Sequence, residues 1–215
     1  IILRFTLTNP LLEETDVYDR YCNEMLKLFD NGINEIIVNS PILERYLRDK
    51  FPNYKLTKSI TAAKEDYDFV KALDDYESIV LPRRHNRNWE LLDSIPKDKR
   101  EKIEILADES CPIDCPRLYT HYNVFANFSL FKKIDESQRN CTTMKNNGAV
   151  FPEINNRDMI YMDEILNTYL PKGYNNFKIS GRNCADHCAK SITPYFFKPE
   201  YQLEGFCQLL NVGLN

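Results

Sequence analysis

Short apolar runs alternate along the chain with stretches in which apolar residues recur every three or four positions. The apolar runs predict strands, because a strand buried on both faces of a parallel sheet shows a continuous hydrophobic run. The predicted strands span residues 2–7, 35–39, 55–60, 78–82, 102–107 and 176–180, with a weaker candidate at 149–151.

The stretches between these runs predict amphipathic helices over residues 17–29, 42–50, 62–73 and 89–95. In the first of them, Cys22, Leu26 and Phe29 are among the apolar residues that fall on one face. Pro41 suits the first turn of the second helix, and Asn88 suits the cap of the fourth. Strands that alternate with helices in this way indicate βα units and a parallel sheet.

Two architectures have this alternation, an open doubly wound sheet and a closed βα barrel. A dinucleotide-binding sheet would carry Gly-x-Gly-x-x-Gly after its first strand, and this chain, with only six glycines, has no such run. We therefore predict an α/β fold with parallel strands, an incomplete or compact TIM-like βα barrel, as a single domain over residues 1–215.

Composition indicates the kind of partner and cellular compartment to expect for the protein. The formal net charge of -4 and the absence of a long apolar segment predict neither a membrane partner nor a strong nucleic-acid signature. The first residues show no basic region or small-residue cleavage site, so a secretory leader is not expected. Seven cysteines are an odd number and indicate reduced thiols rather than a disulfide scaffold, which favours a cytoplasmic location.

Two Cys-x-x-x-Cys pairs follow predicted strands. Cys111 and Cys115 come after the strand at 102–107, and Cys184 and Cys188 come after the strand at 176–180. Because ligands of parallel α/β folds gather at the carboxyl ends of the strands, the two pairs are expected to converge there. Cys141, in the irregular stretch between them, is a fifth candidate ligand.

Four thiolates suit either zinc or an iron–sulfur cluster, and the spacing alone leaves both open. The three-residue gap favours a cluster slightly, and His121 or His187 offers an imidazole as a substitute ligand. Each pair is also compatible with two small apolar residues on one buried helix face. Cys22 and Cys207 lie on apolar helix stripes and are predicted to be core residues.

Charged residues follow the same strands. Lys178 and Arg182 flank the end of the strand at 176–180, and Arg83, Arg84 and Arg87 follow the strand at 78–82. Such a basic edge suits a carboxylate or phosphate, although pairing with acidic helices is the simpler interpretation of the arginines at 83–87. Asp108 and Glu109, beside Cys111, suit an acid, a base or an anchor for the loop.

Three stretches, residues 36–60, 102–122 and 141–182, resemble the collagenase-like peptidase superfamily U32, whose relatives include proteins of anaerobic ubiquinone hydroxylation and of tRNA hydroxylation. The run Phe177-Lys178-Ile179-Ser180-Gly181-Arg182 is similar to the superfamily's Phe-Lys-Ile-x-Gly-Arg, and Glu109, Cys111, Cys115, Arg117 and His121 form the second signature. The resemblance implies a βα barrel, often incomplete, and a cysteine-bound four-iron cluster on Cys111, Cys115, Cys141 and either Cys184 or Cys188. Lys178, Arg182, Glu109 and His121 are the residues expected to support the cofactor.

Peptidase activity is not expected, because the sequence has no Ser-His-Asp constellation and no His-Glu-x-x-His site. The leading hypothesis is an iron–sulfur enzyme, or subunit of one, of the hydroxylase type, acting on a small molecule or an RNA base, with a possible protein partner that completes the site. The alternative is a binding module in which a cysteine-bound zinc or cluster is purely structural.

Overall fold

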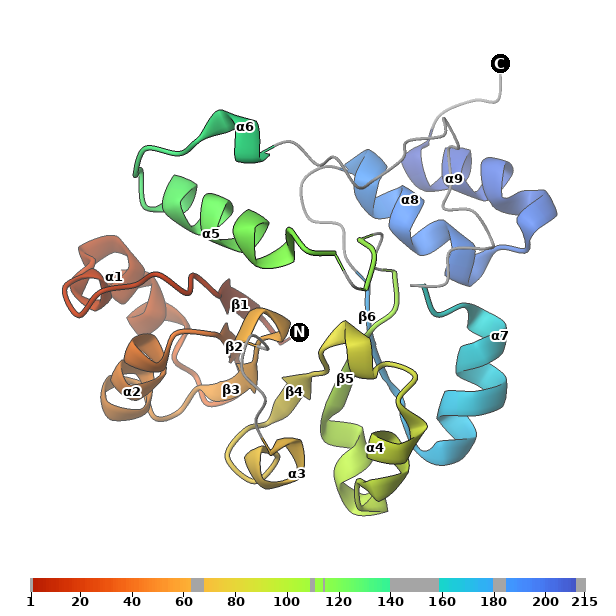
Figure 1. The fold of residues 1–215 in the computed structure, drawn as a ribbon, viewed down its shortest axis with the longest axis horizontal. Helices are drawn as coiled ribbons and strands as arrows, with labels where there is room; N and C mark the ends of the chain where they lie inside the picture. The colour runs from red at the N-terminus through yellow and green to blue at the C-terminus, as the bar shows by residue number, and fades with distance from the viewer. Residues whose placement is uncertain are drawn as a thin grey trace. The chain divides into compact units, whose positions relative to one another are not determined.

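The computed structural model of the protein describes residues 2–62, 68–108, 111–113, 115–139, 159–179 and 185–211. The strands among them are β1 (Arg4–Leu7), β2 (Glu35–Val38), β3 (Lys55–Lys58), β4 (Ser78–Val80), β5 (Ile103–Leu106) and β6 (Asn176–Lys178) (Figure 1). The helices are α1 (Arg20–Phe29), α2 (Pro41–Lys50), α3 (Phe69–Ala72), α4 (Trp89–Ser94), α5 (Leu118–Ser129), α6 (Glu136–Arg139), α7 (Met162–Glu164), α8 (Ala185–Phe196) and α9 (Gln202–Leu210).

The chain forms two compact units whose segments interleave along the sequence. The first unit comprises Ile1–His85 and Pro116–Cys141, and the second comprises Asn86–Cys115 and Thr142–Asn215. The first unit therefore contains β1 to β4, and the second contains β5 and β6.

In the first unit, neighbouring strands pair in parallel in the order β1-β2-β3-β4. The register places Arg4 beside Glu35, and the guanidinium of Arg4 lies 2.7 Å from the Glu35 carboxylate. All four residues of β2 are buried, as expected for a strand with a neighbour on each side and cover on both faces. The parallel pairing confirms the predicted strand–helix alternation of this part of the chain.

In the first unit, α2 begins within one residue of its predicted start, whereas α1 and α3 begin later than predicted, at Arg20 and Phe69. The side chain of Asp19 accepts a hydrogen bond from the Cys22 backbone N–H at 2.7 Å and starts α1. Ser40 caps α2 in the same way, with Pro41 in the first turn. These caps satisfy backbone N–H groups in the first turns of α1 and α2.

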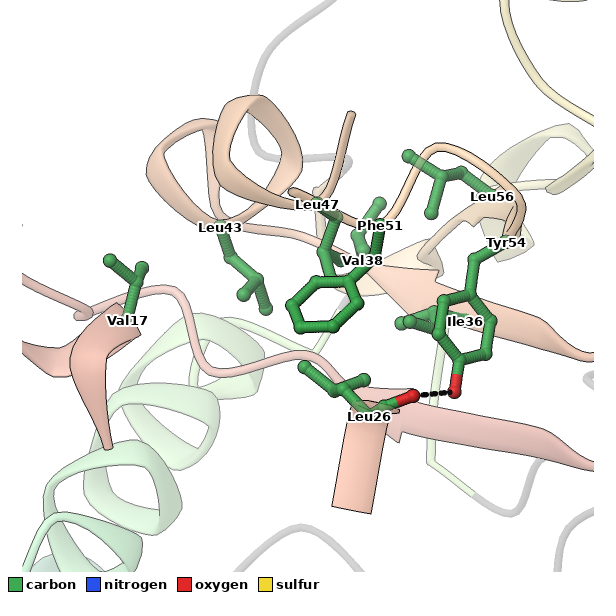
Figure 2. Close-up of a cluster of buried hydrophobic side chains, with 9 residues drawn as sticks. All are labelled: Val17, Leu26, Ile36, Val38, Leu43, Leu47, Phe51, Tyr54 and Leu56. Carbon is green, nitrogen blue, oxygen red and sulfur yellow. Dashed lines mark hydrogen bonds between the residues drawn. The ribbon is translucent and has the colours of Figure 1, made fainter. Parts of the chain in front are cut away.

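The core of the first unit lies between these two helices and the sheet. Figure 2 shows its buried cluster, in which Leu26 of α1 and Leu47 of α2 pack with Ile36 of β2 and Leu56 of β3. The hydroxyl of Tyr54 donates to the Leu26 carbonyl at 2.8 Å, so the polar end of this buried ring has a partner.

In the second unit, β5 and β6 pair in parallel, with Leu106 beside Lys178. The core around them includes two fully buried tyrosines, Tyr169 and Tyr174. Tyr169 donates to the Asn86 carbonyl and Tyr174 to the Leu92 carbonyl, both at 2.6 Å. Gly173 adopts a left-handed conformation with φ of 88°, which ends the preceding helical segment before β6 begins.

The α/β class and the parallel pairing of the predicted strands are confirmed in both units, while closure into a TIM-like barrel stays a prediction. The weak strand candidate at 149–151 lies outside the described residues. Within the described part of the chain, no helix has both the length and the apolar character that crossing a membrane requires.

The prediction that Cys22 and Cys207 are core residues is wrong, since Cys22 is exposed and Cys207 is only half-buried. The apolar stripe of α1 is wider than the face that the sheet covers, and Leu26 is the one residue of that helix that is buried.

Candidate functional site at the carboxyl ends of the strands

The carboxyl ends of β5 and β6 lie side by side in the second unit. The Ala107 N–H donates to the Lys178 carbonyl at 2.9 Å, and the Ala107 carbonyl accepts from the Ile160 N–H at 2.8 Å. The segment that carries Cys111 and Cys115 leaves this edge after β5, and α8, which carries Cys188, follows β6. The second unit thus contains every described thiol of the two pairs.

These three cysteines are reduced and differ in exposure. Cys115 is buried, whereas Cys111 and Cys188 are half-buried. Across the ranges that the structure describes, no group of three Cys, His, Asp or Glu side chains is arranged to hold a metal ion. Cys141, Cys184 and the side chain of His187 lie outside those ranges, so the predicted convergence of the two pairs stays a prediction.

Asp108 follows shortly after β5, and its charge acts on the phenol of Tyr195. Asp108 is 6% exposed and Tyr195 is 7% exposed. Burial raises the pKa of the Tyr195 phenol far above its usual value, and the nearby charges of Asp108 and then Tyr161 raise it further. The phenol is therefore a protonated hydrogen-bond donor at neutral pH.

The hydroxyl of Tyr195 is enclosed and meets no hydrogen-bond acceptor among the described residues. A buried hydroxyl without a partner costs free energy, so an acceptor at this position would stabilise the folded state. The sequence analysis missed this residue. The sequence offers only weak evidence for a role of Tyr195, because its hydroxyl is a single polar atom within the apolar run that follows Pro194.

Lys178, predicted to support a cofactor, has its ammonium 3.4 Å from the carboxylate of Glu104, and the side chain of Glu104 is 8% exposed. The two residues come from paired strands, and the pairing supplies Glu104 with a positive charge in a site where an isolated carboxylate would be costly. Arg182 and Glu109, the other charged candidates at this edge, lie outside the described residues.

His121 lies on α5 and therefore belongs to the first unit. Its Nε2 atom is enclosed and has no hydrogen-bond partner within the described part of the chain. The predicted role of this imidazole as a substitute ligand for the thiols stays a prediction.

The predicted basic edge divides into residues with different surroundings. Arg83 is buried directly after β4, and Arg84 is exposed. Arg87 forms an ion pair with Glu164 at 2.7 Å and donates to the Met159 carbonyl at 2.6 Å. For Arg87, pairing with an acidic residue is confirmed.

Polar residues also follow the strands of the first unit. Asn39 after β2, Ser59 after β3 and Arg83 after β4 are all buried. Asn9 follows β1, and its side-chain amide donates to the Ala126 carbonyl and to the Ser129 hydroxyl of α5, each at 2.9 Å. These contacts hold α5 against the segment that follows β1.

No family model matches the chain, and searches of curated proteins and of solved structures give no significant match. The function must therefore be argued from the residues and their placement.

Proposed function

We propose that the protein is an iron–sulfur enzyme, or a subunit of one, of the hydroxylase type, whose chemistry takes place at the carboxyl ends of β5 and β6. One observation carries the proposal. Cys111 and Cys115 leave β5 and Cys188 follows β6, and these two strands are neighbours in parallel register. In parallel α/β folds this edge is where ligands bind.

The donor chemistry suits such a cofactor. Reduced, partly buried thiols are the usual ligands of iron–sulfur clusters, and Cys111, Cys115 and Cys188 have these properties. The described side chains do not complete a ligand set, so the proposal requires Cys141, Cys184 or both as well. When bound, a cluster of this kind supplies electron transfer or the activation of an oxygen donor.

The chain's own polar groups would act on the substrate. Tyr195 offers a protonated phenol and Asp108 a carboxyl group, both of them buried, and the charge of Asp108 acts on the phenol. We infer that the phenol donates a hydrogen bond to an oxygen of the small molecule or RNA base. The Asp108 carboxylate is placed to accept a proton or to orient that oxygen.

The test is iron, sulfide and zinc analysis, with a visible absorption spectrum, on protein purified without oxygen. We expect iron and sulfide in the wild-type protein and their loss in the Cys111→Ser, Cys115→Ser double variant. The matched control is the Cys22→Ser, Cys207→Ser double variant, which also removes two thiols but leaves both pairs intact, and it should retain the cluster.

Three results would count against the proposal. Stoichiometric zinc that depends on Cys111 and Cys115 would favour a binding module with a structural metal. Equal iron loss in both double variants would show that these thiols have no special role, and a folded, metal-free wild-type protein would remove the basis for the enzyme.

A further inference from the structure

The first unit contains a cleft of about 520 Å³. Its walls come from the segment after β1, from α1 and α2, and from α5, all of which belong to that unit. This volume lies within the range of about 300–1,000 Å³ that is typical of small-molecule sites. The cleft belongs to the first unit, whereas Cys111, Cys115 and Cys188 belong to the second.

The floor of the cleft is apolar. Val17, Leu26 and Leu43 line it and are also members of the buried cluster in Figure 2. Tyr122 and Phe125 of α5 add aromatic surface, and Phe125 is 55% exposed. A ligand in the cleft would thus extend the hydrophobic core of the unit outward, with aromatic rings on one side.

Several polar side chains that line the cleft already have partners within the protein. Asn23 donates to the Val17 and Asp19 carbonyls and accepts from the Tyr46 hydroxyl at 2.6 Å. Asn9 donates to Ala126 and Ser129 and accepts from the Leu11 N–H at 2.8 Å. These groups therefore have little capacity left to replace the water that a strongly polar ligand would lose.

The charge of the residues that line the cleft also disfavours a strongly polar or anionic ligand. Asp16 is the one charged residue among those described around the cleft, and its carboxylate accepts from the Glu13 N–H at 2.7 Å. An anionic ligand would meet a like charge and no cation. An uncharged ligand avoids both the repulsion by Asp16 and the burial of a charge without a counterion.

From these observations we propose that the cleft of the first unit binds an uncharged, largely apolar small molecule that carries an aromatic ring. The floor supplies the apolar area, the rings of Tyr122 and Phe125 select for an aromatic group, and Asp16 rejects anions. The size of the cleft fits one such molecule.

The test uses two probes that share an anilinonaphthalene skeleton and differ by a sulfonate. N-phenyl-1-naphthylamine is uncharged, and 8-anilinonaphthalene-1-sulfonate is its anionic counterpart. Fluorescence titration of the full chain should give saturable binding of the neutral probe at one site. Binding of the sulfonate should be weaker by about tenfold or more, because its charge would be left unpaired beside Asp16.

Two variants of α5 locate the site. Phe125→Ala should weaken binding of the neutral probe by about five- to tenfold. Phe128→Ala is the matched control, since Phe128 is 57% exposed on the same helix but does not line the cleft. Both side chains are exposed, so neither change should prevent folding, and only the first should alter binding.

Asp16→Asn tests the charge argument, because the amide oxygen can still accept from the Glu13 N–H. This variant should narrow the difference between the affinities of the two probes, because binding of the sulfonate becomes tighter. Equal effects of Phe125→Ala and Phe128→Ala, or tighter binding of the sulfonate, would overturn the proposal. A probe signal that is lost on dilution, at the concentration at which a dimer dissociates, would also overturn the proposal. The occupant of the cleft would then be a second copy of the chain.

Discussion

At the scale of single residues, Glu44 shows how the surroundings of a side chain set its charge. Its carboxylate accepts from the Tyr76 hydroxyl at 2.6 Å and from Arg48 at 2.9 Å, and Lys58 lies 3.5 Å away. Partial burial alone would raise the pKa of Glu44. The hydrogen bonds from Tyr76 and Arg48 and the charges of Lys58 and Arg48 outweigh that effect and lower the pKa below its ordinary value.

A carboxyl group whose pKa is lowered by folding stabilises the protein above its unfolded pKa and loses that effect as the pH falls through the folded pKa. We therefore predict that Glu44→Gln lowers the free energy of unfolding by about 2 kcal/mol at pH 7 and by much less near pH 3. Urea denaturation at a series of pH values measures this difference. The control is Glu24→Gln, at an exposed position of α1, which should change the free energy of unfolding little at any pH. If Glu44→Gln instead lowered the free energy of unfolding equally at every pH, the predicted link between its pKa and stability would be wrong.

At the scale of elements, Arg100 connects segments of the second unit that are not joined by strand pairing. Its guanidinium donates to the carbonyls of Ile95 at 2.9 Å, Lys172 at 2.7 Å and Asp93 at 3.1 Å. The same group lies 5.5 Å from the centre of the Tyr174 ring. The planar fork of an arginine thereby holds α4 and the turn before β6 together.

Lysine cannot replace this fork, because an ammonium is a point charge that reaches fewer of the carbonyls at once. Arg100→Lys should lower the free energy of unfolding by about 2–3 kcal/mol, since buried carbonyls lose their donors. Thermal and chemical denaturation check this. Arg20→Lys at an exposed position of α1 is the matched change, and a similar cost for both variants would show that Arg100 has no such role.

The sequence predicted the elements whose signals are local. Ser40 and Pro41 mark the start of α2, and the unbroken apolar run of β2 marks a buried strand. The helix α5 is not among the helices predicted from the sequence, because its apolar residues do not recur at a clear spacing of three or four. Local patterns also placed the thiols after β5 and β6.

The electrostatic interaction between Asp108 and Tyr195 could not be predicted from the sequence, because it joins residues far apart in the chain. Nothing in the apolar run around Tyr195 indicates that its phenol would be buried and influenced by a carboxylate. The exposure of Cys22 was missed for the same reason, since only the packed unit shows how much of the stripe on α1 the sheet covers.

At the scale of the whole molecule, segments of the two units alternate along the chain, and α5 and α6 lie in the segment that returns to the first unit. Asn9 contacts α5 directly through the Ala126 carbonyl and the Ser129 hydroxyl. The packing of α5 in the first unit should therefore depend on Asn9, which lies more than a hundred positions earlier in the chain.

We predict that Asn9→Ala lowers the free energy of unfolding by about 1–2 kcal/mol, because it removes both bonds to α5 and takes away the acceptor of the Leu11 N–H. Hydrogen exchange of the α5 amides should become faster than that of α2. Asn53→Ala, which removes one exposed hydrogen bond to Asp30, is the comparison. Uniformly faster exchange in both helices would indicate general destabilisation instead.

The return of α5 to the first unit also has a consequence for synthesis on the ribosome. The strands β1 to β4 are complete at Val80, but α5 begins only at Leu118. At translation rates of about 5–20 residues per second, the nascent first unit exists for about 2–8 seconds without that wall. During that interval the apolar side of the cleft, which includes Leu26 and Leu43, lacks the rings of Tyr122 and Phe125.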